Sequence, residues 1–267
     1  MTESFSVCLT SYQLPPLNDI AKPFAQFRNI LVPDALPLIK HRWGLVEENL
    51  EQSEAERLSK LFMEAGLANV VISGTMVENN MPPHAVAAIR VDEKGMGVSV
   101  QADAWQIIPW KAFSLLGVAV LKEKIMHTTT KEQGPSAQEK LLKTGILLAT
   151  GIPLPMTRKS KVTTTTEETN LHYYLDLFID RPRLRLRLEG HKLDYQFLKE
   201  KMVMSAQENF RTLLREFLKH APQVLRNGSF ERMASPQALA ITYHDSVKSF
   251  DQECRWLLTL LHSKKNE

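Results

Sequence analysis

Hydrophobic residues recur with a helical period in the first part of the chain. The recurrence places one apolar stripe on a helix, which we expect over residues 53–65. Ser53 and Glu56 are spaced as a capping box at its start, and Gly66 stands where a left-handed C-cap belongs. The stripe sits at i, i+3, i+4 and i+7: Leu58, Leu61, Phe62 and Ala65.

Two strands are predicted on either side of this helix. Residues 5–9 alternate between apolar and polar side chains, and residues 69–73 form a β-branched run. Between them, residues 18–30 favour a short helix weakened by Pro23, and Pro33 opens a helical turn. Together these elements predict a small α/β sandwich module over residues 1–78, in which helices cover one face of a sheet.

Residues 32–73 resemble the C-terminal domain of the bacterial ribosomal stalk protein. The resemblance rests on PDALPLIK at 33–40 and ENLEQSEAERLSKLFMEAG at 48–66, a helix, a loop and a helix of the form A-x-x-L-x-x-x-L-x-x-A-G, followed by a strand. It implies the fold of that domain. The family binds translation factors through a Gly- and Lys-rich helix start, where this chain has Val32, Pro33 and Asp34. Factor binding is therefore not carried over.

After Pro82 and Pro83 the apolar period changes from 3.6 to 2, which favours strands. A helix follows the strands, over residues 198–220, and Pro222 stops it. Short turns join most of the predicted strands, which are residues 85–91, 98–101, 104–108, 111–121, 171–179, 184–188 and 193–197.

These elements predict a second domain over residues 82–222, a strongly bent antiparallel sheet closed by its own helix. The order of elements, with the step Ile108-Pro109-Trp110 before a central strand, resembles a pleckstrin-homology-like barrel. A long insertion over 124–169 interrupts the strands. Its threonine runs are typical of loops, and a helix is possible over 136–148. A competing interpretation divides the domain at the insertion.

Residues 223–267 are expected to form a C-terminal arm. Turn signals make 223–246 irregular, and an amphipathic helix follows from Val247 to His262, capped by Asp245 or Ser246. Its apolar stripe requires a docking surface, which we expect on the body of the same chain. The whole is an α+β protein, and its architecture resembles that of uncharacterised bacterial proteins.

Composition limits the class of protein. Hydrophobic residues make up 43% of the 267 residues, enough for packed cores. Two cysteines, Cys8 and Cys254, lie far apart, so we expect buried, reduced thiols in a cytoplasmic protein. No signal peptide is recognised, and no apolar run approaches the ~20 residues that a membrane span requires.

Catalytic and metal motifs are absent from the sequence. The eight histidines show no i, i+3 or i+4 pairing, and neither phosphate-binding loops nor nucleophile motifs occur, so we expect no cofactor and no metal. Asp245, Asp251 and Glu253 cluster near Arg255. They could serve acid–base chemistry, but the favoured interpretation is capping of the last helix. Trp105 and Trp110 are expected at the core or its rim.

Basic residues concentrate in the middle of the chain. Residues 122–161 carry eight basic and three acidic side chains, whereas residues 1–80 carry six basic and ten acidic ones. Four arginines recur with period two, so that one strand face is predicted to carry guanidinium groups opposite Leu184, Leu186 and Leu188. The candidate contact residues are Arg181, Arg183, Arg185, Arg187, Lys122, Lys124, Arg158, Lys159 and Lys161.

Three functions remain open from the sequence. The leading hypothesis is a non-catalytic adaptor that binds an unidentified protein partner through the arginine strand and the insertion. The second is a module that binds an anion, either acidic lipid, a phosphorylated ligand or nucleic acid, through that strand. The third is an enzyme of an unrecognised type. Against the first two, the arginines could instead form a solvated face, or pair with cross-strand partners such as Asp176.

Overall fold

The computed structural model describes residues 3–79, 81–86, 88–101, 104–133, 160–180, 183–237 and 243–264. Two compact units emerge from it. One combines residues 1–122 with 171–267, and the other comprises residues 123–170. The predicted helix over 136–148 lies outside the described residues. Within them the protein is a mixed α+β structure with several sheets.

The first sheet has three strands in the order β2-β1-β3, with both neighbours antiparallel to the central strand. They are β1 (Phe5–Leu9), β2 (Leu45–Leu50) and β3 (Asn69–Ser73). The predictions for β1 and β3 are confirmed. Strand β2 was not predicted, because Glu47, Glu48 and Asn49 interrupt its apolar run.

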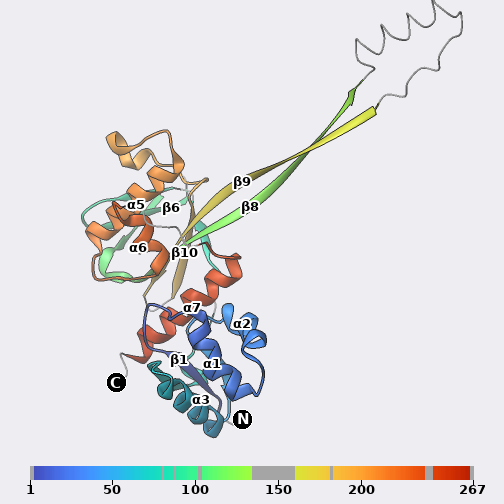
Figure 1. The fold of residues 1–267 in the computed structure, drawn as a ribbon. Helices are drawn as coiled ribbons and strands as arrows, with labels where there is room; N and C mark the ends of the chain where they lie inside the picture. The colour runs from blue at the N-terminus through green and yellow to red at the C-terminus, as the bar shows by residue number, and fades with distance from the viewer. Residues whose placement is uncertain are drawn as a thin grey trace, which may run out of the picture. The chain divides into compact units, whose positions relative to one another are not determined.

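Three helices accompany this sheet: α1 (Leu17–Arg28), α2 (Val32–Lys40) and α3 (Gln52–Glu64). In Figure 1, α1 and α3 lie alongside β1. Their apolar faces form one core with the sheet, in which Phe24, Leu58 and Phe62 are fully buried. Helices therefore cover one face of the sheet, as predicted.

The start of α3 differs from the prediction. Its capping box joins Glu51 and Glu54, two residues before the predicted pair of Ser53 and Glu56, because the chain turns into the helix directly after β2 ends at Leu50. The left-handed conformation of Gly66 is confirmed by its φ of 75°. A Cβ added at Gly66 would meet no atom within 4 Å, so the glycine is required by the backbone rather than by packing.

A second three-stranded sheet is an antiparallel meander in the order β5-β6-β7. Its strands are β5 (Ile89–Val91), β6 (Gly95–Gln101) and β7 (Ala104–Pro109). The predicted strand over 85–91 is divided, because its first part is β4 (His84–Val86), which joins a different sheet. The short 3-10 helices η1 (Gly74–Met76) and η2 (Trp110–Ala112) complete these segments.

The third sheet has five strands in the order β11-β8-β9-β10-β4. Its long strands are β8 (Phe113–Gln133) and β9 (Ser160–Ile179), followed by β10 (Leu184–Glu189) and the two-residue edge strand β11 (Leu225–Arg226). β9 and β10 pair antiparallel, whereas β4 and β11 add in parallel at the two edges. The sheet is therefore mixed rather than wholly antiparallel, and the described strands form no closed barrel.

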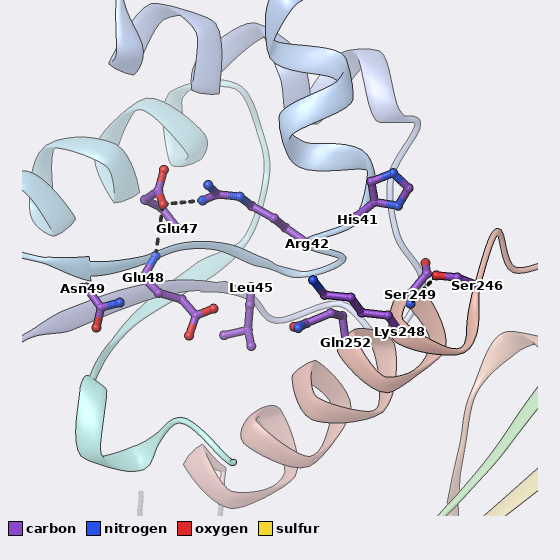
Figure 2. A pocket seen from close by; sticks show the side chains of 10 residues that line it. All are labelled: His41, Arg42, Leu45, Glu47, Glu48, Asn49, Ser246, Lys248, Ser249 and Gln252. Atoms are coloured by element: carbon purple, nitrogen blue, oxygen red, sulfur yellow. Dashed lines mark hydrogen bonds and ion pairs between the residues drawn. The ribbon is translucent and has the colours of Figure 1, made fainter. Parts of the chain in front are cut away.

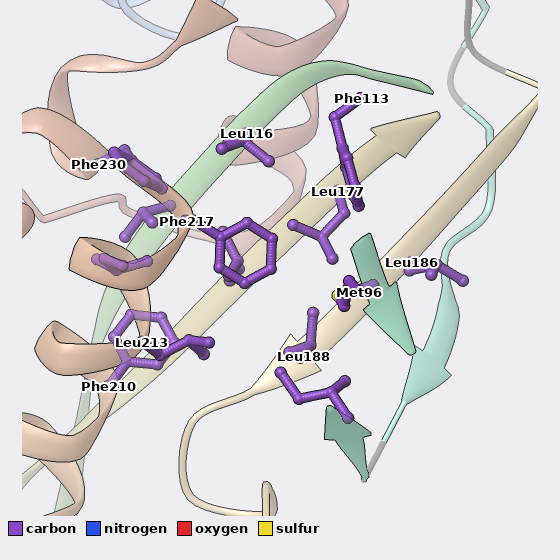
Figure 3. Close-up of a cluster of buried hydrophobic side chains, with 14 of the residues drawn as sticks. Met96, Phe113, Leu116, Leu177, Leu186, Leu188, Phe210, Leu213, Phe217 and Phe230 are labelled. Carbon is purple, nitrogen blue, oxygen red and sulfur yellow. The ribbon is translucent and has the colours of Figure 1, made fainter. Parts of the chain in front are cut away.

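Helix α5 (Ala206–His220) closes the core of this region. Figure 3 shows Phe210, Leu213 and Phe217 pointing from the helix towards apolar side chains of the strands, among them Leu177 and Leu188. The predicted use of a helix to cover the sheet is confirmed. Trp110 lies in the same core, with its ring stacked on His220 at 5.2 Å, as expected for a core residue.

Residues 193–205 form neither the predicted strand nor the first turns of the predicted helix. The chain makes a 3-10 segment, η3 (Gln196–Lys201), in which Lys199 takes a φ of 51°. The carboxylate of Asp194 accepts a hydrogen bond from the backbone N–H of Gln196 at 3.0 Å. Such a local bond competes with strand pairing. Ser205 then caps α5 by accepting a bond from the N–H of Glu208.

The last segment holds α6 (Gly228–Ala234), which the sequence did not indicate, and α7 (Val247–Ser263), which it did. Ser246 caps α7. The helix packs against the face of the first sheet opposite α1–α3, where Cys8 and Leu45 lie, and against β8 and β9, where Ala119 and Phe178 lie. The predicted docking of this helix on the body of the chain is confirmed, and α7 packs against two sheets.

Candidate functional site

The arginine strand is β10, and its two faces differ as predicted. Leu186 and Leu188 point into the core shared with α5. Arg185 and Arg187 stand on the opposite face, which α7 covers. This is the face where Gly117 of β8 also lies against α7, since a Cβ there would come within 2.9 Å of the Sγ of Cys254.

Two carboxylates neutralise the two arginines. Arg187 lies in register with Asp176 on β9 and donates from Nε to its Oδ1 at 2.7 Å. Arg185 donates from Nε to the Oδ2 of Asp176 at 2.9 Å. Both guanidinium groups also donate to Oδ1 of Asp251 on α7, from Arg187 at 3.0 Å. The four side chains carry two positive and two negative charges.

Burial and ion pairing act in opposite directions on these arginines. The side chains of Arg185 and Arg187 are 2% and 12% exposed. Loss of hydration by itself lowers the pKa of each guanidinium, but attraction to Asp176 and Asp251 outweighs it, so that both pKa values are raised above the ordinary value. Both groups are therefore charged and committed to internal partners.

The expectation of a solvent-exposed arginine face is accordingly wrong for Arg185 and Arg187. The other interpretation, pairing with Asp176 across the strands, is confirmed. Arg183 precedes β10 and is exposed, while Arg181 lies outside the described residues. An external anion would have to displace two carboxylates and a helix to reach this strand.

The predicted lysines are distributed over β8, β9 and their surroundings. Lys122 is exposed, and its ammonium lies 3.6 Å from the ring centroid of Tyr243. Lys124 is exposed as well, and it is not without an interaction partner. Lys161 belongs to β9, whereas Arg158 and Lys159 lie outside the described residues.

The acidic cluster near the start of α7 does not cap the helix, whose N-cap is Ser246, and its carboxylates bind different partners. Asp245 pairs with Lys40 at 2.6 Å, and this hydrogen bond lowers the pKa of Asp245. Glu253 is buried and accepts bonds from Asn227 at 2.7 Å and from His244 at 2.9 Å. Each carboxylate thus holds a different part of the chain to α7.

A cleft of about 500 Å³ lies between β2 and the start of α7. Figure 2 shows Lys248 and Gln252 on α7 and Glu48 and Asn49 on β2 at its walls. Asn49 takes a φ of 59°. The side chains of Lys248, Gln252 and Asn49 have no hydrogen-bond partner within the described part of the chain.

The carboxylates of this cleft are already occupied. Glu47 is buried and accepts bonds from Arg28, at 2.5 Å from Nη2, and from Arg42. Glu48 is held by Arg255 through two bonds of 2.7 and 2.5 Å. A general base needs a carboxylate that is free to accept a proton. Both glutamates of the cleft therefore have internal partners, while His41 also lines it and lies 3.9 Å from Asp245.

Strands β8 and β9 continue beyond their partners in the five-stranded sheet. β8 has 21 residues and β9 has 20. Yet β11 pairs with β8 at Leu115 and Leu116 alone, and β10 pairs with β9 from Tyr174 to Ile179. Through residues 123–133 and 160–170, the described residues supply no third strand. We call these two segments the ribbon.

The threonines of the ribbon were expected in loops, and that expectation is wrong. Residues 128–130 and 163–166 lie in β8 and β9. Threonine is β-branched and favours strands, so a run of threonines suits a strand with polar side chains. Strand propensity was the signal that could have revealed the ribbon from sequence.

Neither a metal site nor a membrane-spanning helix is found among the described residues. Among the described residues, no three histidine, cysteine or acidic side chains are placed to hold a metal ion together. Within the same residues, no helix has both the length and the apolar character to cross a membrane. The two cysteines are free and buried, as expected.

Comparisons with known proteins give no relative. No protein-family model, no curated protein and no solved structure matches the chain significantly.

Proposed function

We propose that this chain is a non-catalytic interaction protein that binds a protein partner through the ribbon, residues 123–133 and 160–170. The carrying observation is that both strands extend beyond their outer neighbours within the described residues. Each outer edge then presents backbone N–H and C=O groups that an added strand can pair with.

Stability supports the same proposal. A two-stranded ribbon is marginally stable in water on its own, because it buries little apolar surface. A partner strand adds hydrogen bonds along an edge and gives the ribbon a third strand. The ribbon lies almost wholly within the insertion over 124–169, so the insertion would thereby form the contact surface, in line with the sequence-based hypothesis for that segment.

Anion binding through the arginine strand has less support. Arg185 and Arg187 already have Asp176 and Asp251 as partners, and α7 covers them. Replacing these arginines by serine would also leave the buried Asp176 and the partly buried Asp251 unpaired and disturb the fold. That replacement cannot separate binding from folding, so Arg183, which is exposed, is the informative position.

The test uses a photocrosslinking amino acid in the full chain. One variant carries it at Met126 of β8, which is 67% exposed, and the control carries it at Met63 of α3, which is 59% exposed. In extracts of the native source we expect one discrete protein adduct from position 126 and none of that size from position 63. The adduct should persist when salt is raised, because strand pairing depends weakly on charge.

Two further variants decide between the hypotheses. When a short turn replaces residues 123–170, the crosslinked protein should no longer be recovered in a pull-down. The remaining unit should still unfold cooperatively. Arg183→Ser should leave binding unchanged. Binding that survives the deletion, or that falls steeply with salt and with Arg183→Ser, would contradict the ribbon and favour the anion-binding alternative.

A further inference from the structure

Three consecutive apolar side chains are exposed in the loop between η3 and α5. The exposed fractions are 49% for Met202, 48% for Val203 and 105% for Met204. A run of this kind is disfavoured on a soluble surface unless it serves a contact. Methionine is also enriched in protein interfaces, where its flexible side chain adapts to a partner.

The loop is fixed by a buried side chain rather than left free. The amide of Asn209, which is 4% exposed, makes two bonds with the backbone of Val203. Its Oδ1 accepts from the N–H at 2.8 Å, and its Nδ2 donates to the C=O at 2.8 Å. A surface held in this way loses little conformational entropy when it binds.

A groove of about 430 Å³ is lined mainly by residues 197–201, which directly precede this loop in the sequence. Val91, Phe197 and Leu198 contribute apolar side chains to it. The rest of its lining is charged, and we call these four residues the rim: Lys199, Glu200, Lys201 and Glu216. The groove and the apolar loop offer a receptor and an insert on the same surface. A surface that holds both is suited to an isologous contact, in which the same patch is used twice.

The charges on the rim favour the same arrangement. Lys199 and Glu200 are exposed, and their side chains have no ion-pair partner in the part of the chain that the structure describes. Lys201 is paired internally with Glu216. The rim is thus balanced, whereas a nucleic acid or an anionic membrane attracts a net positive surface. Two-fold symmetry places a lysine opposite a glutamate twice.

We propose that this surface, residues 197–204 with Val91, is a two-fold symmetric contact between two copies of the chain. The side chain of Met204 enters the partner's groove, and Lys199 of each copy pairs with Glu200 of the other. The proposal is independent of the ribbon, because no residue of 123–170 takes part.

Self-association of the full chain, followed by sedimentation velocity over a range of concentrations, tests the contact. We expect a concentration-dependent dimer, and Met204→Lys should raise its dissociation constant at least tenfold. Because Met204 is fully exposed, this variant should keep the unfolding midpoint of the parent. The matched control, Met63→Lys on α3, should dimerise like the parent.

A charge exchange tests the symmetry. Lys199→Glu and Glu200→Lys should each weaken the dimer, since each places like charges together twice. The double variant K199E/E200K restores opposite charges and should recover most of the affinity. Failure of this recovery would overturn the two-fold geometry.

Other outcomes reject the contact itself. A parent that stays monomeric at every concentration overturns it, as does equal weakening by Met63→Lys. Dimerisation that persists in Met204→Lys and disappears on deletion of 123–170 belongs to the ribbon. Binding to vesicles of anionic phospholipid that Met204→Lys abolishes, without self-association, would assign the loop to a lipid surface instead.

Discussion

Arg255 of α7 forms a two-bond ion pair with Glu48 of β2, at 2.7 Å between Nη1 and Oε1 and 2.5 Å between Nη2 and Oε2. The same guanidinium donates from Nε to the backbone C=O of Glu78 at 2.7 Å. Each of its three nitrogens therefore donates one hydrogen bond to the N-terminal part of the chain, although 207 residues separate it from Glu48.

Removing this pair should loosen the contact between α7 and the first sheet. We expect Arg255→Met to lower the free energy of unfolding by about 2 kcal/mol, because Glu48 loses a partly buried bidentate partner. Urea unfolding measures the change. In a double-mutant cycle with Glu48→Gln the two effects should not add, and full additivity would show that the pair contributes nothing.

The buried charge balance around β10 gives a second prediction. Asp251→Asn leaves two arginines facing Asp176 alone, so we expect a loss of about 3 kcal/mol in the free energy of unfolding. The double variant R185M/D251N carries one charge of each sign and should be less destabilised than the sum of its single variants. The exposed ion pair between Lys40 and Asp245 offers a control. Asp245→Asn should lower the free energy of unfolding by less than about 1 kcal/mol.

Close packing at Gly44 gives a third. A Cβ at this residue would lie 2.0 Å from the indole of Trp256, whose Nε1 donates to the C=O of Leu9 at 3.1 Å. We expect Gly44→Ala to displace the indole and lower the stability by about 2 kcal/mol. Gly97→Ala is the comparison, because its nearest neighbours lie at 3.4 Å and beyond. Equal thermal midpoints for the two variants would contradict the close approach.

A fourth prediction concerns the two buried thiols and the pH dependence of the free energy of unfolding. Burial raises the pKa of Cys8 from 9.0 to about 12 and raises that of Cys254 well above 9.0. In the unfolded chain both thiols ionise near the ordinary value, whereas in the folded protein they keep their protons. The unfolded state therefore binds fewer protons above that value, and the free energy of unfolding should fall as pH rises from 9 towards 12.

Thiol labelling checks the same groups directly. With a disulfide reagent at pH 8, native protein should react slowly and urea-unfolded protein should show two thiols. Rapid labelling of the native protein would mean that at least one cysteine is accessible. Separate Cys8→Ser and Cys254→Ser variants identify which one reacts.

Much of the fold could be predicted from the sequence, because the spacing of apolar residues a few positions apart decides between helix and strand. The alternation of leucine and arginine in β10 correctly assigned its two faces, and the apolar period of α7 correctly required a docking surface. Errors arose where a side chain overrides the pattern. The carboxylate of Asp194 binds the backbone of Gln196 where the alternating segment gives way to the 3-10 helix η3, and the polar residues of β2 conceal its strand.

The candidate site was harder to predict than the fold. Period two shows that Arg185 and Arg187 share a face, but not what lies over it. Asp176 is in register on the adjacent strand and was recognised as a partner. Asp251 lies 66 residues from Arg185 in the sequence, and no local signal connects them, so the covering of the arginines by α7 had no counterpart in the sequence pattern.

The bond between Trp256 and the backbone of Leu9 spans 247 positions of the chain. Contacts of such separation form late, because loop-closure entropy must be overcome before they contribute. We expect slow refolding, on a timescale of milliseconds to seconds or longer. In that interval the sheet faces beneath α7 remain uncovered, so intermediates should be prone to aggregate at high protein concentration.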